Sequence, residues 1–380
     1  MAGIYIHIPF CSQFCSYCDF FSVRDLAQMP RLLQALETEM LLRGHEISSP
    51  RTLYIGGGTP SLYKAKDLLG LVARARGLWQ TAFEECSVEL NPEDVTEDYC
   101  GALRQGGVNR LSIGIQSFSD EDLRFMHRRH TAARGIEAVK AAQKAGLSNL
   151  SVDLIFGFPG LSMPRWKAHL EQALALEPKH LSAYQLGIEP GTPLYRRYIR
   201  GRLQPLEQEL AAEQYAYLQE RMDKAGWEQY EISNFAQPGY RAQHNSAYWR
   251  GSPYLGLGPS AHSFDGRCRK ANVKSLPRYL RALAEGRPAL RVERPVAQSR
   301  YNEFVMTRLR TLEGFRLVDL QAWMEGFSFG SGAEGCVLGL WERLSRPLWS
   351  EGVLRQQGDY IKIPPNKWFV SDGIIMRLMV

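Results

Sequence analysis

Long apolar runs are absent from this sequence. No stretch of its 380 residues approaches the roughly 18 consecutive apolar residues that a membrane-spanning helix needs. The first ten residues, MAGIYIHIPF, contain no basic segment followed by a long apolar stretch, so we expect no secretory signal. Together the two absences predict a cytoplasmic protein.

A strong charge of one sign is also absent. The chain carries 46 basic and 40 acidic residues, a net charge of +6. Its basic residues are scattered, and the local clusters HRRH (127–130) and RRYIRGR (196–202) are typical of solvated faces. We therefore predict no nucleic-acid partner.

Cysteine is scarce, and most of it is dispersed. Cys86, Cys100, Cys268 and Cys336 lie far apart without paired spacing, which argues against a disulfide framework in a signal-less chain of this size. The remaining three of the seven cysteines fall within eight positions, in HIPFCSQFCSYCDFF (7–21). Such a cluster is typical of a bound metal or metal cluster.

The first half of the chain alternates short β-type runs with amphipathic helical patterns. This order predicts parallel strands joined by right-handed crossovers, and six units predict an α/β fold, a partial (β/α)6 TIM-like barrel. The predicted strands are 4–8, 52–56, 87–90, 110–115, 150–157 and 181–188, and the clearest helices are 30–44, 65–79 and 165–177.

The sequence changes character after residue 203. A polar helix over 205–225 leads into an aromatic, glycine-rich tract, and residues 275–291 predict a helix followed by a linker. The tail predicts a smaller α+β unit, with a winged helix as one form of it. We expect three parts: a barrel over 1–203, an extension over 204–290 and a C-terminal domain over 291–380.

Residues suited to chemistry follow each predicted strand. The cysteine loop, GGGTPS (56–61), ELNPED (89–94), IQSF (115–118), FGFPG (156–160) and GIEPGT (187–192) all fall at carboxyl ends of strands. Barrels build their active sites on that face. Turns rich in Gly, Pro and Asn are common in such loops, but the cysteines are not explained in that way.

Two metal sites are compatible with three clustered thiolates. A structural zinc ion needs four protein ligands, and His7 is the nearby candidate for a fourth. Iron–sulfur clusters take cysteine thiolates, and Cys11, Cys15 and Cys18 on a four-iron cube would leave one iron open. The spacing C-x3-C-x2-C, with Tyr17 before the last cysteine, resembles the signature of the radical S-adenosylmethionine (SAM) superfamily. That resemblance implies a [4Fe–4S] cluster with SAM chelated at the open iron.

The order YIHIPFC, GGGTPS, ELNP, IQSF and DLIFGFPG resembles the oxygen-independent coproporphyrinogen III oxidase family. The glycines allow close approach of a ligand to the backbone. A buried Asp153 needs a partner, such as a ribose hydroxyl, Arg128 or a purely structural ion pair. Gln116 binds the cofactor or only caps a loop. The likeness implies SAM contacts from Tyr5, Tyr17, Gly56, Gly57, Gly58, Thr59, Glu89, Gln116, Arg128 and Asp153.

Two departures separate this chain from the decarboxylating oxidases. They carry a further cysteine two residues after the third, where this chain has Phe20, and an extension ahead of the first strand, which here begins at residue 4. Both departures argue against that enzymatic activity and favour the sister group, the HemW-type heme chaperones. This resemblance implies a heme chaperone with an acceptor hemoprotein, an electron donor such as a flavodoxin or ferredoxin, and peripheral membrane association.

HNSAYW (244–249) is similar to a motif of that group associated with heme binding. A neutral imidazole can ligate heme iron, and aromatic rings suit the macrocycle. The likeness implies heme contacts from His244, Tyr248 and Trp249, with His262 as a rival ligand and a satisfied structural histidine as the alternative for His244. The competing functions are an oxygen-independent coproporphyrinogen III oxidase and a structural zinc protein that binds nucleic acid.

Overall fold

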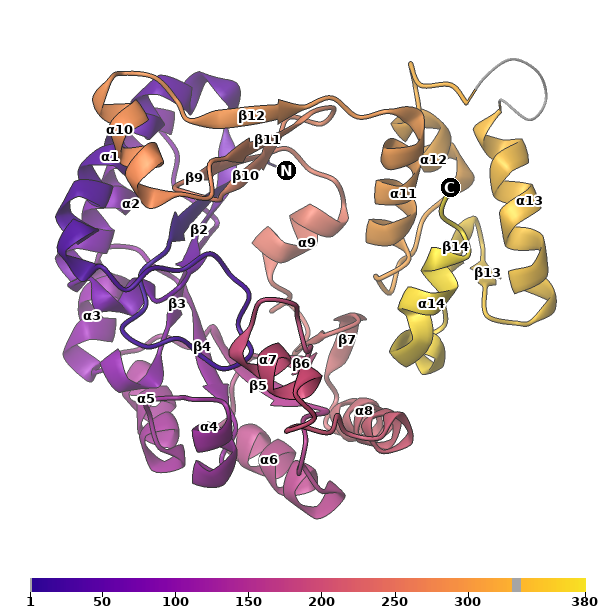
Figure 1. Cartoon of the computed structure of the whole chain (residues 1–380), viewed down its shortest axis with the longest axis horizontal. Coiled ribbons are helices and arrows are strands. Elements are labelled where there is room, and N and C mark those ends of the chain that lie inside the picture. The colour runs from indigo at the N-terminus through magenta and orange to yellow at the C-terminus, as the bar shows by residue number, and fades with distance from the viewer. Residues whose placement is uncertain (1, 330–335) are drawn as a thin grey trace.

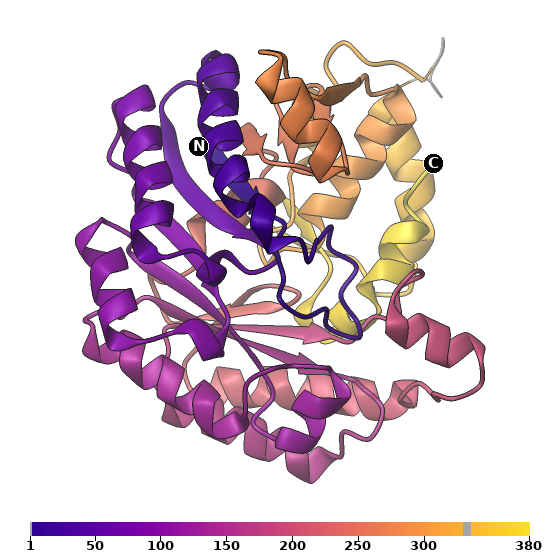
Figure 2. The same cartoon turned by 60° about the vertical axis from the view of Figure 1, so that its left-hand side comes forward.

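A computed structural model describes residues 2–329 and 336–380 of the chain. Its centre is a twelve-stranded sheet in the order β12-β11-β10-β9-β1-β2-β3-β4-β5-β6-β8-β7. The sheet curves into an open barrel with helices on its outer side, and a separate group of helices follows at the C-terminus (Figures 1 and 2). No helix in the described residues is long and apolar enough to cross a membrane.

The six predicted strands are confirmed, and they pair in parallel in chain order. They are β1 (Ala2–Ile8), β2 (Pro50–Gly57), β3 (Glu85–Leu90), β4 (Arg110–Gln116), β5 (Leu150–Phe156) and β6 (His180–Gln185). The helices after them are α1 (Met29–Arg43), α2 (Ala65–Trp79), α3 (Glu97–Gln105), α4 (Asp120–Phe125), α5 (Ala132–Lys144), α6 (Met163–Ala175), α7 (Pro193–Ile199) and α8 (Gln208–Lys224). Short 3-10 turns are η1 (Leu26–Gln28), η2 (Gly44–Glu46), η3 (Pro60–Leu62) and η4 (Pro92–Asp94).

Alternation along the strands separates two environments. Ile4 and Ile6 of β1 are fully buried with Leu32 and Leu36 of α1 in one apolar core, because successive strand residues point to opposite faces. The other face carries polar side chains toward the barrel interior. Those residues include Tyr5, His7, Thr52, Tyr54, Glu85, Glu89, Arg110, Ser112, Ser151, Asp153, His180 and Ser182. A polar lining of this kind suits a ligand-binding interior.

Residues 228–293 extend the sheet at both edges. On one side β8 (Asn234–Ala236) joins β6 antiparallel and β7 (Glu228–Glu231) follows. On the other, β9 (Tyr254–Leu257) lies parallel to β1, followed by β10 (His262–Phe264), β11 (Arg269–Asn272) and β12 (Leu290–Glu293). Helices α9 (Gln243–Trp249) and α10 (Leu276–Ala284) connect these strands. The segment 275–291, predicted as a helix followed by a linker, therefore runs into a strand at its end.

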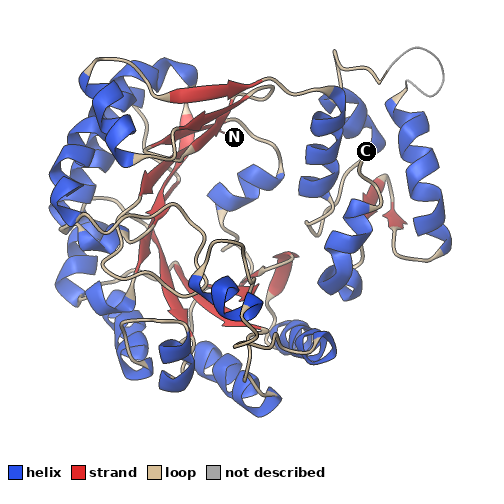
Figure 3. Cartoon of the chain, in the orientation of Figure 1, coloured by secondary structure: helices blue, strands red, loops and turns tan. Residues whose placement is uncertain are grey.

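The C-terminal residues form a small helical unit with one hairpin, as Figure 3 shows by colour, in agreement with the predicted α+β character. Its elements are α11 (Ala297–Arg308), α12 (Leu317–Trp323), α13 (Val337–Ser350), β13 (Arg355–Gln357), β14 (Tyr360–Lys362), η6 (Pro365–Val370) and α14 (Ser371–Met376). The unit contacts the barrel at α8, where Tyr215 packs against Phe369 and Gln219 Nε2 donates to the Pro365 carbonyl at 2.9 Å.

Candidate functional site

The cysteine loop runs from the carboxyl end of β1 to η1 and is anchored by backbone hydrogen bonds. The Cys11 amide donates to the Val23 carbonyl at 3.0 Å, and the Val23 amide donates to the Pro9 carbonyl at 2.7 Å. The Ser16 amide donates to the Met126 carbonyl at 3.1 Å. These bonds fold the loop back over the barrel end, so all three cysteines are held over the carboxyl ends of the strands.

The three thiols are partly buried, and none of them is in a disulfide. Burial raises the pKa of Cys11, and it raises the pKa of Cys18 to about 11. Polar groups already face two of the sulfurs: Thr59 Oγ1 donates to Cys11 Sγ at 3.6 Å and Arg128 Nη1 to Cys15 Sγ at 3.4 Å. Metal ligation requires the deprotonated thiolate form of cysteine. The positive charges of bound iron and of Arg128 would favour that form at these three cysteines.

His7 does not supply a fourth ligand to a zinc ion. Its Nε2 lies 2.9 Å from the Phe21 carbonyl oxygen and its Nδ1 3.0 Å from Tyr5 Oη. Both ring nitrogens are therefore engaged within the protein. In the described part of the chain, no three His, Cys, Asp or Glu side chains gather closely enough to hold a single metal ion.

The GGG segment is packed too closely for side chains. An ideal Cβ on Gly58 would lie 2.6 Å from the Phe10 carbonyl oxygen and 3.0 Å from Cys11 Sγ. Gly57 has φ +116°, and its Cβ would lie 2.5 Å from His7 Nδ1. The glycines therefore bring the end of β2 directly under the cysteine loop, as the close approach expected from the sequence requires.

Glu89 stands beside this glycine segment at the end of β3. Tyr54 Oη donates to its Oε1 at 2.7 Å, and the Gly57 amide donates to Oε2 at 2.9 Å. Burial raises the pKa of Glu89 to about 7, although both hydrogen bonds favour the carboxylate. Such a carboxyl is near its titration point at neutral pH, and it is suited to accept a hydrogen bond from a cationic or hydroxyl group.

Arg128 joins the cysteine loop to the ends of β3 and β4. Its Nη2 donates to Asn91 Oδ1 at 2.8 Å and to the Gly114 carbonyl at 2.9 Å, in addition to the Cys15 contact. Its Nε is buried without a hydrogen-bond partner among the described residues. Tyr17 lies next to it, and burial raises the Tyr17 pKa. A buried orphan donor beside the thiols is what an absent anionic ligand would satisfy.

Gln116 has a left-handed backbone. Its φ is +65°, and the register between β4 and β5 shifts between Ile113 and Gln116. A non-glycine residue in this region is strained, and such strain concentrates at functional sites. The side chain folds back over Gly114, whose ideal Cβ would lie 2.7 Å from Gln116 Nε2.

Asp153 is held by serines and not by Arg128. Ser112 Oγ donates to its carboxylate at 2.9 Å and Ser151 Oγ at 3.0 Å, whereas Arg128 is bound to Asn91 and Cys15. Burial raises the pKa of Asp153, with Ser182, Ser112 and Ser151 opposing the shift. Of the partners considered for Asp153, Arg128 is therefore not the one it meets, and the carboxylate lies on the interior face of the barrel.

Helix α9 lies at the opposite, amino end of the strands. The Gln243 and His244 amides donate to the Glu85 carboxylate at 2.8 and 2.9 Å, because orphan amides at a helix start need an acceptor. Gly3 of β1 faces the His244 ring, since an ideal Cβ there would lie 3.1 Å from it. In Figure 1, α9 accordingly sits inside the open ring of elements.

The heme role of His244 stays a prediction, and the structure shows which groups its ring meets. The ring is 2% exposed and stacks on Tyr54, and its Nδ1 and Nε2 each lie 2.8 Å from a hydroxyl, Thr52 Oγ1 and Tyr248 Oη. Burial lowers the His244 pKa to about 3, so the ring is neutral. A neutral imidazole has one donor and one acceptor, and both are satisfied here. These contacts are what the alternative of a satisfied structural histidine requires, while the rival ligand His262 is exposed on β10.

The two other residues of the motif diverge. Tyr248 points into the barrel, where its ring meets Tyr254 edge-on at 4.5 Å. Trp249 instead lines a cleft between α9 and the C-terminal unit. The expected heme residues are therefore not one surface: His244 and Tyr248 face inward, and only Trp249 faces the cleft.

Several residues of this site were not singled out from the sequence. Tyr54, Glu85, Asn91 and the serines around Asp153 hydrogen-bond to predicted residues, and the positive charge of Arg110 lies near Asp153. Asn91 donates from Nδ2 to Thr59 Oγ1 at 3.2 Å and accepts from Arg128. Asn91 could have been found from the sequence, because it directly follows the buried end of β3 in ELNP. Tyr54 and Ser112 could have been found from the alternation along their strands, which turns both side chains toward the barrel interior.

The barrel and the three-cysteine loop define the class of a radical SAM protein, and the family model of the radical SAM superfamily matches residues 5–173. Heme chaperone HemW of Bacillus subtilis (strain 168) is 37% identical over 75% of this chain and 76% of its own length. The HemW proteins of Mycobacterium tuberculosis (H37Rv) and Escherichia coli (K12) are 34% and 35% identical; the matches cover 99% and 95% of this chain, and 94% and 93% of those proteins. The chain belongs to the HemW family of the radical SAM superfamily.

The fold agrees with a solved relative. The structure of coproporphyrinogen III oxidase (HemN) from Escherichia coli, described as a radical SAM enzyme, has a TM-score of 0.84 at 23% identity and covers 100% of this chain and 90% of that one. Superfamily membership implies a [4Fe–4S] cluster and SAM. The thiol set, the tight glycine segment and the orphan Arg128 Nε fit those two groups.

Proposed function

We propose that this protein is a heme chaperone, which binds heme and passes it to an acceptor hemoprotein. The single observation that carries the proposal is the match to proteins named heme chaperone HemW, which covers nearly the whole chain in two of the three relatives above. The likeness therefore includes the sheet extensions and the C-terminal unit, and not only the radical SAM barrel.

We assign the two cofactors to the barrel part, residues 1–203. Cys11, Cys15 and Cys18 would hold the cluster, and Arg128 would neutralise charge beside it. The expected SAM contacts of Tyr5, Tyr17, the segment 56–59, Glu89, Gln116 and Asp153 remain a prediction, supported by their position at the carboxyl ends or interior face of the strands. When bound, the cluster and SAM supply one-electron chemistry. Residues 204–290 and 291–380 would handle heme and its recipient.

An electron donor such as a flavodoxin or ferredoxin would approach at the cysteine loop. Phe14 and Phe20 of this loop are 43% and 66% exposed, and Ile199 of α7 is 61% exposed. Helix α7 contacts the loop, since the Leu194 amide donates to the Ser16 carbonyl at 2.8 Å. Arginines border this apolar face, including Arg24 over the Phe14 ring. Apolar and basic groups together suit an acidic partner. Slower cluster reduction at high salt would support this docking, and peripheral membrane association remains a prediction.

The rival function is the oxidation of coproporphyrinogen III. The exposed Phe20 occupies the position where those enzymes carry their further cysteine, and this difference argues against coproporphyrinogen III oxidation by this protein. The test uses anaerobically reconstituted protein: heme is titrated by its absorbance, and the loaded protein is then mixed with a candidate apo-hemoprotein. We expect saturable binding and transfer. Turnover of coproporphyrinogen III with release of carbon dioxide, without heme transfer, would refute the proposal.

A further inference from the structure

Asn91 lies at the carboxyl end of β3, directly before the 3-10 turn η4. An asparagine at the start of a helical segment usually caps it with its side chain. Here the side chain makes no capping hydrogen bond. The backbone is nevertheless held in place, because the Asn91 backbone amide donates to Ser61 Oγ at 3.1 Å and its carbonyl accepts from the Asp94 amide at 3.1 Å. The carboxamide of Asn91 therefore serves a purpose other than capping.

That carboxamide connects two groups that donate hydrogen bonds to cysteine sulfurs. Its Oδ1 accepts from Arg128 Nη2 at 2.8 Å, and its Nδ2 donates to Thr59 Oγ1 at 3.2 Å. Thr59 Oγ1 in turn donates to Cys11 Sγ at 3.6 Å, and Arg128 Nη1 donates to Cys15 Sγ at 3.4 Å. One side chain thus supports the polar contacts of two of the three loop cysteines.

The hydrogen bond from Asn91 fixes the direction of the Thr59 hydroxyl. A hydroxyl has one proton and two lone pairs. Because Asn91 Nδ2 donates to one lone pair, the proton of Thr59 is left for Cys11 Sγ. Thr59 is only 4% exposed, so water competes little for this proton. Without the Asn91 donor the hydroxyl is free to turn away from the sulfur.

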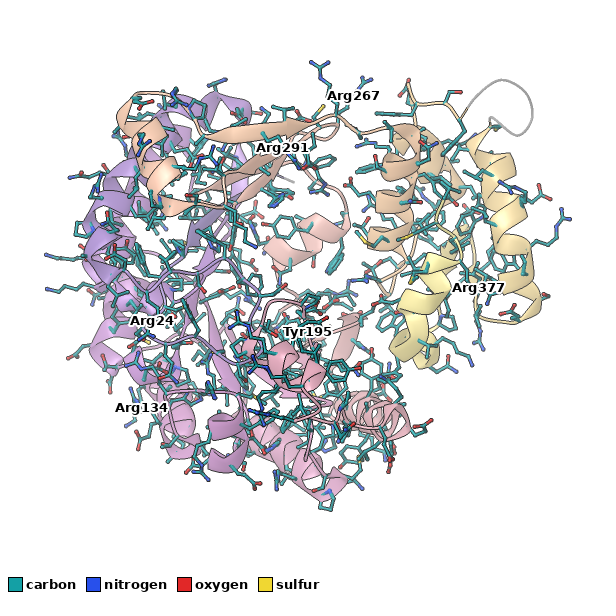
Figure 4. All side chains as sticks on the ribbon, in the orientation of Figure 1. Arg24, Arg134, Tyr195, Arg267, Arg291 and Arg377 are labelled. Carbon is teal, nitrogen blue, oxygen red and sulfur yellow. The ribbon has the colours of Figure 1, made fainter. Side chains whose placement is uncertain are left out.

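The hydrogen bond to Asn91 fixes the plane of the Arg128 guanidinium. A surface arginine such as Arg267 projects away from the body of the molecule (Figure 4). Arg128 is instead held at Nη2, which donates to Asn91 Oδ1 and, at 2.9 Å, to the Gly114 carbonyl. Because the guanidinium is planar and rigid, these two acceptors also determine where Nη1 points. It points at Cys15 Sγ.

Hydrogen bonds to the sulfurs of an iron–sulfur cluster influence its reduction potential. Reduction adds one negative charge, and donors that face the ligating sulfurs stabilise that charge. Donors to Cys11 and Cys15 therefore favour the reduced form and raise the potential. Loss of the residue that orients both donors should lower the potential.

We propose that Asn91 is a positioning residue that raises the reduction potential of the cluster, because it directs Thr59 and Arg128 at two of the ligating sulfurs. The inference rests on the cluster assignment made with the proposed function, and it names a residue that controls how readily the cluster accepts an electron. Among the described residues, Asn91 makes no hydrogen bond to a cysteine. It therefore acts through its two neighbours.

The test compares anaerobically reconstituted wild type with Asn91→Leu, which has a similar shape but no hydrogen-bonding group in its side chain. The fraction of reduced cluster is measured spectroscopically at a series of potentials, without SAM and without heme. We expect the equilibrium constant for reduction of Asn91→Leu to fall at least tenfold, a decrease of about 59 mV for a one-electron couple.

Asn109→Leu is the matched control. Asn109 directly precedes β4, at the opposite end of the strands, and its side chain also makes two hydrogen bonds. It accepts from the Cys86 amide and donates to the Glu84 carbonyl, both at 2.8 Å. Because neither bond leads to the cysteine loop, its equilibrium constant for reduction should stay within about twofold of the wild-type value.

A double variant tests the route through Thr59. Thr59→Val removes the hydroxyl that donates to Cys11 Sγ, so it should lower the potential as well. In the variant with both Thr59→Val and Asn91→Leu, the decrease should be smaller than the sum of the two single decreases, since part of the effect of Asn91 passes through Thr59. Fully additive decreases would overturn the proposal.

Different failures have different meanings. If Asn91→Leu does not take up the cluster, Asn91→Asp keeps the test valid, because it retains an acceptor for Arg128 but cannot donate to Thr59. Its potential should fall relative to Asn109→Asp. If either Asn91 variant carries the cluster at the potential of its Asn109 counterpart, the inference is overturned while the proposed function stands. A wild type without the visible absorbance of a cluster refutes the cluster assignment itself.

Discussion

His244→Ala is expected to destabilise the fold while leaving heme binding intact. In the wild type the ring separates the hydroxyls of Thr52 and Tyr248, and it stacks on Tyr54 with ring centres 5.2 Å apart. Its removal leaves the buried Thr52 hydroxyl and the partly buried Tyr248 hydroxyl without a partner, at about 1–3 kcal/mol each. Loss of the ring contact costs about 0.5–1.5 kcal/mol more. Allowing for partial relaxation, we expect a loss of about 3–5 kcal/mol in the free energy of unfolding.

The measurement is urea unfolding of His244→Ala under anaerobic conditions, beside two reference variants. Tyr248→Phe removes one hydroxyl and leaves His244 Nε2 unpaired, so it should cost about 1–2 kcal/mol. His45→Ala replaces an exposed histidine and should stay within about 0.5 kcal/mol of the wild type. Heme affinity of folded His244→Ala should remain within twofold of the wild-type value. A tenfold weaker heme affinity with a loss below 1 kcal/mol would refute this reasoning and restore His244 as an iron ligand.

Three further outcomes test the cluster end of the barrel. Glu89 keeps its proton up to a pH of about 7 in the folded protein but only to about 4.5 when unfolded. The folded protein is therefore stabilised by this proton at low pH and loses that stabilisation as the pH rises between the two values. In urea unfolding without cofactors, the free energy of unfolding of Glu89→Gln should rise by about 2 kcal/mol relative to the wild type between pH 5 and pH 8. In Gly57→Ala the new methyl group would clash with His7, and the backbone there has φ +116°, so the free energy of unfolding should fall by at least about 2 kcal/mol. Gly77→Ala is the control, because open space surrounds Gly77, and it should not destabilise the protein. Equal melting temperatures of the two variants would contradict this. Serine at any of the three loop cysteines should abolish the visible absorbance of the reconstituted cluster, and serine at the exposed Cys336 should preserve it.

The sequence by itself determined the barrel and the position of its chemistry. Parallel strands are fixed by local patterns of apolar and helical residues, and the loop after each strand must fall at the same end. For that reason the sequence alone predicts that the cysteines, the glycine segment, Glu89 and Gln116 lie at the same end of the barrel. The family likeness then supplied the cofactors, which local patterns do not specify.

Only the tertiary structure decided which groups those residues meet. The Nδ1 of His244 meets the hydroxyl of Thr52, which lies 192 positions away in the chain. Asp153 meets Ser112 of the neighbouring strand and Ser151 of its own strand, and not Arg128, which the sequence offered as one possible partner. The cleft that Trp249, Arg300 and Trp323 line joins α9 to α11 and α12, which are far apart in the chain. Hydrogen bonding and burial depend on such distant contacts, and no local pattern encodes them.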